Sequence, residues 1–91
     1  MTRFRKISAV SERLSGDALL VVNLDQGTAF RLNGTARLMW DLAADGRTAE
    51  EIAGALGERL GTSSERLRTD AAALLDELAA AELLEPVGDG P

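Results

Sequence analysis

Residues 27–40, "GTAFRLNGTARLMW", pass from a strand pattern to a helix pattern within a single residue. The alternation over residues 28–32 places Phe30 and Leu32 on one face and Arg31 on the other, as in a half-buried strand. Asn33 follows directly, and an asparagine there can accept a hydrogen bond from a free amide of the helix that it opens. The sequence therefore predicts a strand over residues 28–32 and a helix from residue 34 to about residue 44, which ends at Gly46.

Two further strand patterns precede this stretch. The run "ALLVVNL" (residues 18–24) is short, rich in β-branched side chains and bounded by turn residues, and residues 9–14 form a weaker run of the same kind. The intervening turns, at residues 15–17 and 25–27, are short. Short connections favour an antiparallel meander of the strands.

Two further helix patterns follow it. Thr48 and Glu51 form a capping box at the start of one predicted helix, which ends at Gly61. Thr62 and Glu65 form a second box, and the last helix is predicted to continue to about residue 81. In the middle helix, the spacing of Ile52, Leu56 and Leu60 predicts one buried line.

The predicted fold class is α+β, with a three-stranded antiparallel sheet followed by three helices that cover one face of the sheet. We expect a single domain over residues 1–91, with a core from about residue 9 to residue 85 and flexible tails. Residues 1–8 are predicted as a tail or an irregular first strand, and residues 86–91 as a frayed end. Trp40 and Met39 are assigned to the core.

The composition excludes most catalytic chemistry. The chain has 91 residues, of which 45% are hydrophobic and 3% aromatic, and it contains no Cys and no His. Disulfides, the common zinc sites, Ser-His-Asp triads and the usual general base near neutral pH are therefore ruled out. The carboxylates are scattered over the predicted helix faces. We expect a protein that is not an enzyme and holds neither a cofactor nor a metal.

The charge argues against nucleic acid as a partner. The net charge is −5, whereas nucleic-acid binding draws most of its affinity from the neutralisation of phosphates. The basic cluster of Arg3, Arg5 and Lys6 is assigned to a solvated tail. No signal peptide or membrane-spanning run is recognisable in the sequence. We expect a cytoplasmic protein that binds neither nucleic acid nor a membrane.

The strand over residues 28–32 is the first candidate binding element. In a meander it lies at the edge of the sheet, where its backbone groups are unpaired, and Arg31 is its only charge. An edge without Pro or a run of charges is suited to the addition of a peptide as a further strand. The residues of this predicted edge are Thr28, Ala29, Phe30, Arg31 and Leu32.

The last helix carries two apolar lines, and only one of them is needed for a core. Leu67, Ala71, Leu74 and Leu78 form the predicted core line. The adjacent line comprises Arg68, Ala72, Leu75 and Ala79. By itself this second line favours a wide buried face. Beside an open strand edge, it also fits a shallow groove with Leu75 as a wall and Arg68 at the mouth.

One more surface is a candidate contact. Leu19 and Val21 lie on the face of their strand opposite to Leu20, Val22 and Leu24. We assign Leu19 and Val21 to a candidate dimer or partner contact, although strand propensity alone also explains them.

Two other classes are disfavoured by specific residues. In a winged helix-turn-helix the β-wing follows the helices, and the candidate recognition helix here is acidic, with Glu65, Asp70 and Asp76 among its residues. An acyl carrier protein needs an Asp-Ser-Leu attachment site, which "GTSSERL" (residues 61–67) does not provide.

The chain resembles the PqqD-like family of recognition elements for the leader peptides of ribosomally made, modified natural products. The resemblance runs from about residue 18 to residue 84 and rests on "VVNLDQGTAFRLNGTARLMW", "DGRTAEEIAGAL" and "RLRTDAAALLDELAAAELLE". It departs from many relatives at Glu82, where they have Gly before the final Leu-Leu.

This resemblance implies a winged-helix-like fold in which a leader peptide docks as a fourth strand, antiparallel to the third strand and beside the third helix. The expected peptide-binding residues are Thr28, Ala29, Phe30, Arg31, Leu32, Leu67, Arg68, Ala71, Ala72 and Leu75. Because the chain is short and unfused, we expect it to hand the peptide to separate enzymes, as in lasso peptide clusters, where the partner is a leader peptidase. The alternatives are a PqqD-type peptide chaperone for a radical SAM enzyme of quinone cofactor synthesis, and a scaffold or transcriptional winged-helix protein.

Overall fold

The computed structural model describes residues 2–87, which form three helices and five strands. In chain order these are β1 (Arg3–Lys6), β2 (Val10–Ser15), β3 (Ala18–Asn23), β4 (Ala29–Leu32), α1 (Gly34–Ala44), α2 (Ala49–Leu60), α3 (Ser64–Ala80) and β5 (Leu84–Val87). Strands β2, β3 and β4 form an antiparallel meander in that order. The predicted α+β class, with three strands followed by three helices, is confirmed.

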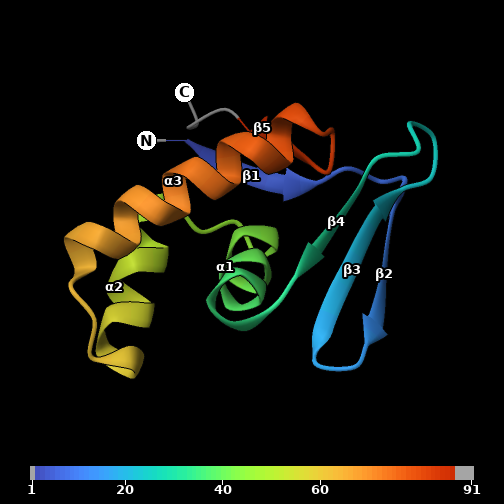
Figure 1. Ribbon diagram of the computed structural model, residues 1–91. Helices are drawn as coiled ribbons and strands as arrows, with labels where there is room; N and C mark the ends of the chain where they lie inside the picture. The colour runs from blue at the N-terminus through green and yellow to red at the C-terminus, as the bar shows by residue number, and fades with distance from the viewer. Residues whose placement is uncertain (1, 88–91) are drawn as a thin grey trace.

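Helix α1 lies between the meander on one side and the pair formed by α2 and α3 on the other (Figure 1). Its Trp40 is fully buried and Met39 is 3% exposed, as the sequence predicted. Ile52 and Leu56 of α2 and Leu78 of α3 complete the centre of the core. Each side chain of this kind contributes roughly 1.5–3 kcal/mol on full burial, so this layer holds the sheet and the helices together.

The two ends of the described chain pair with each other, which local patterns did not predict. Strand β1 pairs antiparallel with β5, with Phe4 opposite Pro86. Phe4 is 8% exposed and Leu84 is 1% exposed. Of the two alternatives predicted for the N-terminus, the strand is therefore confirmed for residues 3–6 and the tail is wrong there, and the prediction of a frayed end is wrong for residues 86 and 87. Residues 88–91 lie outside the described part.

The helix caps are partly as predicted. Thr48 and Glu51 form the capping box, with the Glu51 amide donating to Thr48 Oγ1 at 3.2 Å and the Thr48 amide to Glu51 Oε1 at 2.9 Å. Asn33 precedes α1 but its side chain makes no capping bond. Ser63, not Thr62, caps α3 by accepting a hydrogen bond from the Arg66 amide. The second predicted box is therefore wrong.

Three apolar residues face the opposite way from the expectation. Leu19 and Val21 belong to the core, at 6% and 0% exposed, and do not form a partner contact. Leu60, the last residue of the predicted buried line of α2, is 44% exposed. The outward-facing apolar side chains of the meander are Leu20, Val22 and Leu24. No helix within residues 2–87 has both the length and the apolar character that a membrane span requires.

Candidate functional site

Strand β4 has one paired side and one open side. It pairs with β3 in a register that sets Val22 opposite Ala29 and Leu19 opposite Leu32, and within residues 2–87 no strand pairs with its other side. The same register continues to Asn23, whose amide donates to the Thr28 carbonyl at 2.9 Å. Antiparallel residues alternate between bonded and non-bonded pairs. The backbone groups of Ala29 and Arg31 therefore face the open side.

One flank of α3 is tied to the start of this edge. Thr28 Oγ1 donates to the Ala81 carbonyl, and Asn23 Nδ2 donates to the Glu82 carbonyl, both at 2.5 Å. With 3.6 residues per turn, Leu74 lies on the same side of the helix as Ala81, two turns earlier. Leu74 is half-buried and packs against the core. The β4-side flank of α3, as we call it, comprises Asp70, Leu74, Glu77 and Ala81.

The helix ends at this junction in a conformation that is unusual for its sequence. Glu82 has a φ of 60°, the left-handed region that favours glycine. Its amide donates to the Ala79 carbonyl, and the Leu83 amide donates to the Leu78 carbonyl at 2.9 Å. This pair of bonds is the Schellman motif, in which the left-handed position is most often Gly. Glu82, at the position where many members of the resembled family have Gly, thus keeps the helix end intact but in a strained backbone conformation.

The structure separates the expected binding residues into three groups. On β4, Ala29 and Arg31 are exposed, Phe30 is half-buried and Leu32 is buried, and Thr28, just before the strand, is half-buried. On α3, Leu67, Ala71 and Leu75 are core residues, with exposures of 4%, 0% and 2%. Arg68 and Ala72 are exposed on the other flank of α3, which faces α2. No measurement of binding bears on these residues, so their roles stay predictions.

The expectation that Leu75 is the open wall and Leu74 the core residue is wrong. Leu75 is 2% exposed and lines the floor of a depression of about 200 Å³ whose other walls include Phe4, Ala49 and Ala72. Leu74 and Leu75 are about 100° apart around the helix, so the sequence pattern tolerates either one facing inward. The pairing of β1 with β5 brings Phe4 to this side of the helix, and Leu75 is therefore the leucine that faces inward. The sequence alone did not single out Leu74, Glu77 and Asp70 as a shared flank beside β4, because no local signal marks them.

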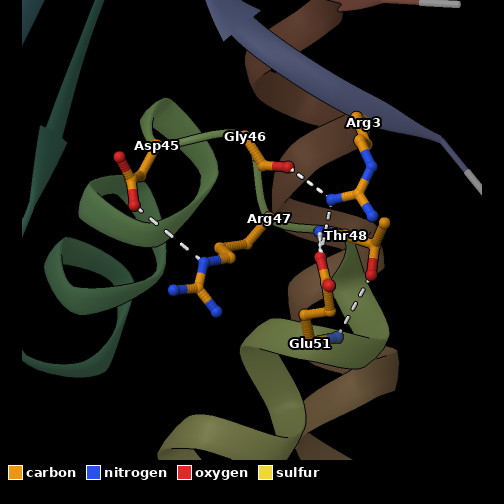
Figure 2. A network of polar contacts seen from close by, with 6 residues as sticks. All are labelled: Arg3, Asp45, Gly46, Arg47, Thr48 and Glu51. Carbon is orange, nitrogen blue, oxygen red and sulfur yellow. Dashed lines mark hydrogen bonds and ion pairs between the residues drawn. The ribbon is translucent and has the colours of Figure 1, made fainter. Parts of the chain in front are cut away.

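A polar network closes the junction of β1, α1 and α2 (Figure 2). Arg3 Nη1 donates to the Gly46 carbonyl and to Glu51 Oε1, each at 2.8 Å. Hydrogen bonding from the Thr48 backbone, and then from Arg3, lowers the pKa of Glu51. The same carboxylate therefore completes the helix cap and holds the first strand against the start of α2.

A second carboxylate links the meander to the core. Glu12 of β2 accepts hydrogen bonds from Trp40 Nε1 at 3.0 Å and from Lys6 Nζ at 2.5 Å. Burial acts to raise the pKa of Glu12, but the hydrogen bonds of Lys6 and Trp40 and the charge of Lys6 outweigh it, so the pKa is lowered. The group is thus a charged structural anchor.

The chemistry available at this site is that of binding. The open side of β4 offers backbone donors and acceptors, and the β4-side flank offers one apolar side chain between carboxylates. Over residues 2–87 no group of acidic side chains has the geometry to hold a metal ion. The arrangement fits an extended chain that pairs with β4 through its own backbone.

Three comparisons with known proteins give one family and one fold. Residues 18–84 match the family model described as coenzyme PQQ synthesis protein D (PqqD). The structure is similar to TbiB1, solved in complex with the TbiA(beta) leader peptide, with a TM-score of 0.80 and 28% identity over 93% of this chain and 99% of that one. It is also similar to lasso peptide synthetase B1, solved with a leader peptide, with a TM-score of 0.82 and 23% identity over 92% of this chain and 99% of that one. The curated proteins include no match.

Proposed function

The chain belongs to the PqqD family, and we propose on this premise that it binds the leader segment of a ribosomally made precursor peptide. The observation that carries the proposal is the open side of β4, which presents the backbone groups of Ala29 and Arg31. The similarity to TbiB1, which was solved with a leader peptide, supports the same conclusion. Binding by backbone pairing requires no catalytic residue, which agrees with a chain that lacks His and Cys.

The leader docks antiparallel to β4 and extends the meander by one strand. Its backbone pairs with Ala29 and Arg31, and its side chains alternate between the two faces of the sheet. The side chains on the helix side lie against Leu74, between the carboxylates of Asp70 and Glu77. Of the residues expected from the sequence, Thr28, Phe30 and Leu32 shape the strand, and Leu67, Ala71 and Leu75 support α3 from the core.

The protein then delivers the bound peptide to a separate enzyme in the cytoplasm, and a lasso peptide leader peptidase is our first choice. This choice is supported by the resemblance of this chain to the small members of the family that occur in lasso peptide clusters. A PqqD-type chaperone that serves a radical SAM enzyme is the second candidate, favoured by the description of the matching family model. In both cases the chain itself acts as a non-catalytic, single-domain adaptor.

Proline substitutions on β4 test the docking directly. Ala29→Pro removes an amide that faces the open side, and proline is tolerated at such edge positions. We expect the variant to remain folded and to bind the synthetic leader of the neighbouring precursor gene at least about tenfold more weakly, since one ladder bond is lost and the added strand is obstructed. The measurement is calorimetric titration, with thermal denaturation as the check of folding.

A matched control exists on the opposite edge of the sheet. The alternation that exposes the Ala29 amide also directs the Leu14 amide of β2 to the outer edge, and Leu14 is 62% exposed. Leu14→Pro is expected to bind the leader as the unmodified protein does. Equal affinity of a folded Ala29→Pro variant would show that β4 is not the docking strand.

A further inference from the structure

The face of the meander turned away from the helices is apolar at its centre. Leu20 and Val22 are half-buried although no helix covers them, and Leu24 is 70% exposed. These side chains, with Ser11 and Arg13, line a shallow depression of about 160 Å³. We call this surface the outer sheet face and define it by Ser11, Arg13, Leu20, Val22, Leu24, Ala29 and Arg31.

This face is positively charged in an acidic chain. Arg13 and Arg31 lie opposite Leu20 on its two neighbouring strands, so a guanidinium stands on either side of the apolar centre. No carboxylate occupies a position on this face as defined, although the chain has a net charge of −5. Exposed apolar patches with a charged rim mark interaction sites, and the sign of the rim selects the partner.

We propose that the outer sheet face is the docking surface for the separate processing enzyme, which presents an apolar side chain bordered by carboxylates. This inference rests on the proposed function and adds the partner's surface to it. A second copy of this chain fits poorly, because a face-to-face pair would bring the arginines of both copies together. Like charges at an interface are unfavourable, whereas carboxylates of an enzyme would pair with both guanidinium groups.

The position of the face relative to the leader explains why an enzyme would dock there. A leader added beside β4 places alternate side chains on the outer sheet face, next to Ala29 and Arg31. An enzyme seated on this face therefore touches the protein and the bound peptide together. Binding of leader and enzyme is then coupled, and each tightens the binding of the other by the same factor.

The test uses a purified leader peptidase encoded beside the gene for this protein and measures its affinity for the leader-loaded protein by biolayer interferometry. Leu24→Asp places a carboxylate at the most exposed apolar side chain of the face, and we expect it to weaken enzyme binding by at least about tenfold, as the loss of an apolar anchor does. Its affinity for the leader is expected to stay within about twofold of the original, because Leu24 lies outside β4 and α3.

Leu60→Asp is the matched control, since Leu60 is an exposed leucine at the end of α2 and is not among the residues of this face. It is expected to leave enzyme affinity unchanged. Equal enzyme affinity of a folded Leu24→Asp variant would overturn the proposal. So would a dimer in sedimentation that Leu24→Asp dissociates, since the face would then bind a second copy. Failure of the proposed function is a separate result, namely no leader binding by the unmodified protein in the leader titration.

Discussion

The two flanks of α3 are held in different ways. The flank that faces α2 carries the buried Leu75, which lines a depression together with Phe4 and Ala49, and the Arg3 network holds β1 next to it. The β4-side flank is anchored at its C-terminal end, where Thr28 and Asn23 donate to the carbonyls of residues 81 and 82. Further along, it presents a half-buried Leu74.

This difference teaches how a small domain leaves a half-buried apolar side chain on a helix whose other side belongs to the core. A side chain that fills a gap on the α2 side contributes to folding, because its apolar surface is already removed from water. A side chain that is only half covered retains apolar surface for a partner. Anchoring by hydrogen bonds at one end fixes the position of the helix relative to β4 without covering the strand edge.

The largest effect is expected from a substitution on the flank of α3 that faces α2. Leu75→Asp would bury a carboxylate without a partner, and we expect it to lower the free energy of unfolding by more than about 4 kcal/mol. Since small domains are stable by only about 5–15 kcal/mol, much of the population would unfold. Urea denaturation followed by Trp40 fluorescence measures the change.

Leu74→Asp is the corresponding substitution on the β4-side flank. It is expected to fold, because the side chain is half-buried and its carboxylate can reach water, and to weaken leader binding by about tenfold. If Leu74→Asp unfolds the domain as severely as Leu75→Asp, the two flanks do not differ in the way described. Ala72→Asp, an exposed change on the α2 side, serves as the control with unchanged leader affinity.

A smaller effect sharpens the role of the anchored end. Glu82 adopts a left-handed conformation that costs a non-glycine residue roughly 1–2 kcal/mol. Glu82→Gly is therefore expected to raise the free energy of unfolding, by about 1 kcal/mol after the greater chain entropy of unfolded glycine is deducted. Thermal denaturation measures the gain. A decrease would mean that the Glu82 side chain makes a stabilising contact in solution that outweighs its backbone strain.

The smallest expected effect concerns the pH dependence of stability that comes from Glu12, the carboxylate that joins β2 to Trp40. The pKa of Glu12 is lowered in the folded protein, so its contribution to stability is present above the ordinary glutamate pKa of about 4.3. That contribution is lost as the pH falls through the lowered pKa, because the folded state then takes up a proton less readily than the unfolded state. In Glu12→Gln the acid decline of the unfolding free energy should be shallower.

Trp40 is the only tryptophan and donates one of the two hydrogen bonds that Glu12 accepts. Its fluorescence therefore follows the acid-induced unfolding. An identical decline in Glu12→Gln and the unmodified protein would assign acid sensitivity to other carboxylates.

Much of the architecture could be predicted from local chemistry. The strand that stops at Leu32, the capping box of Thr48 and the left-handed ends at Gly46 and Gly61 are all where the sequence indicated. Each depends on neighbours within a few residues, so a pattern in the sequence suffices. The same holds for the outward alternation of Ala29 and Arg31 on β4, which makes the strand edge a candidate site.

By itself, then, the sequence determined the order of the meander and the helices, the buried Trp40 and the edge at residues 28–32. Only the tertiary structure decided that β1 pairs with β5, that Leu75 faces inward, and that Leu74 stays half-buried. The physical reason is that a helical repeat fixes which residues share a line but leaves the rotation of the helix about its axis free. That rotation is set by Phe4 and the helix α2, which are distant in the sequence and adjacent only in the folded chain.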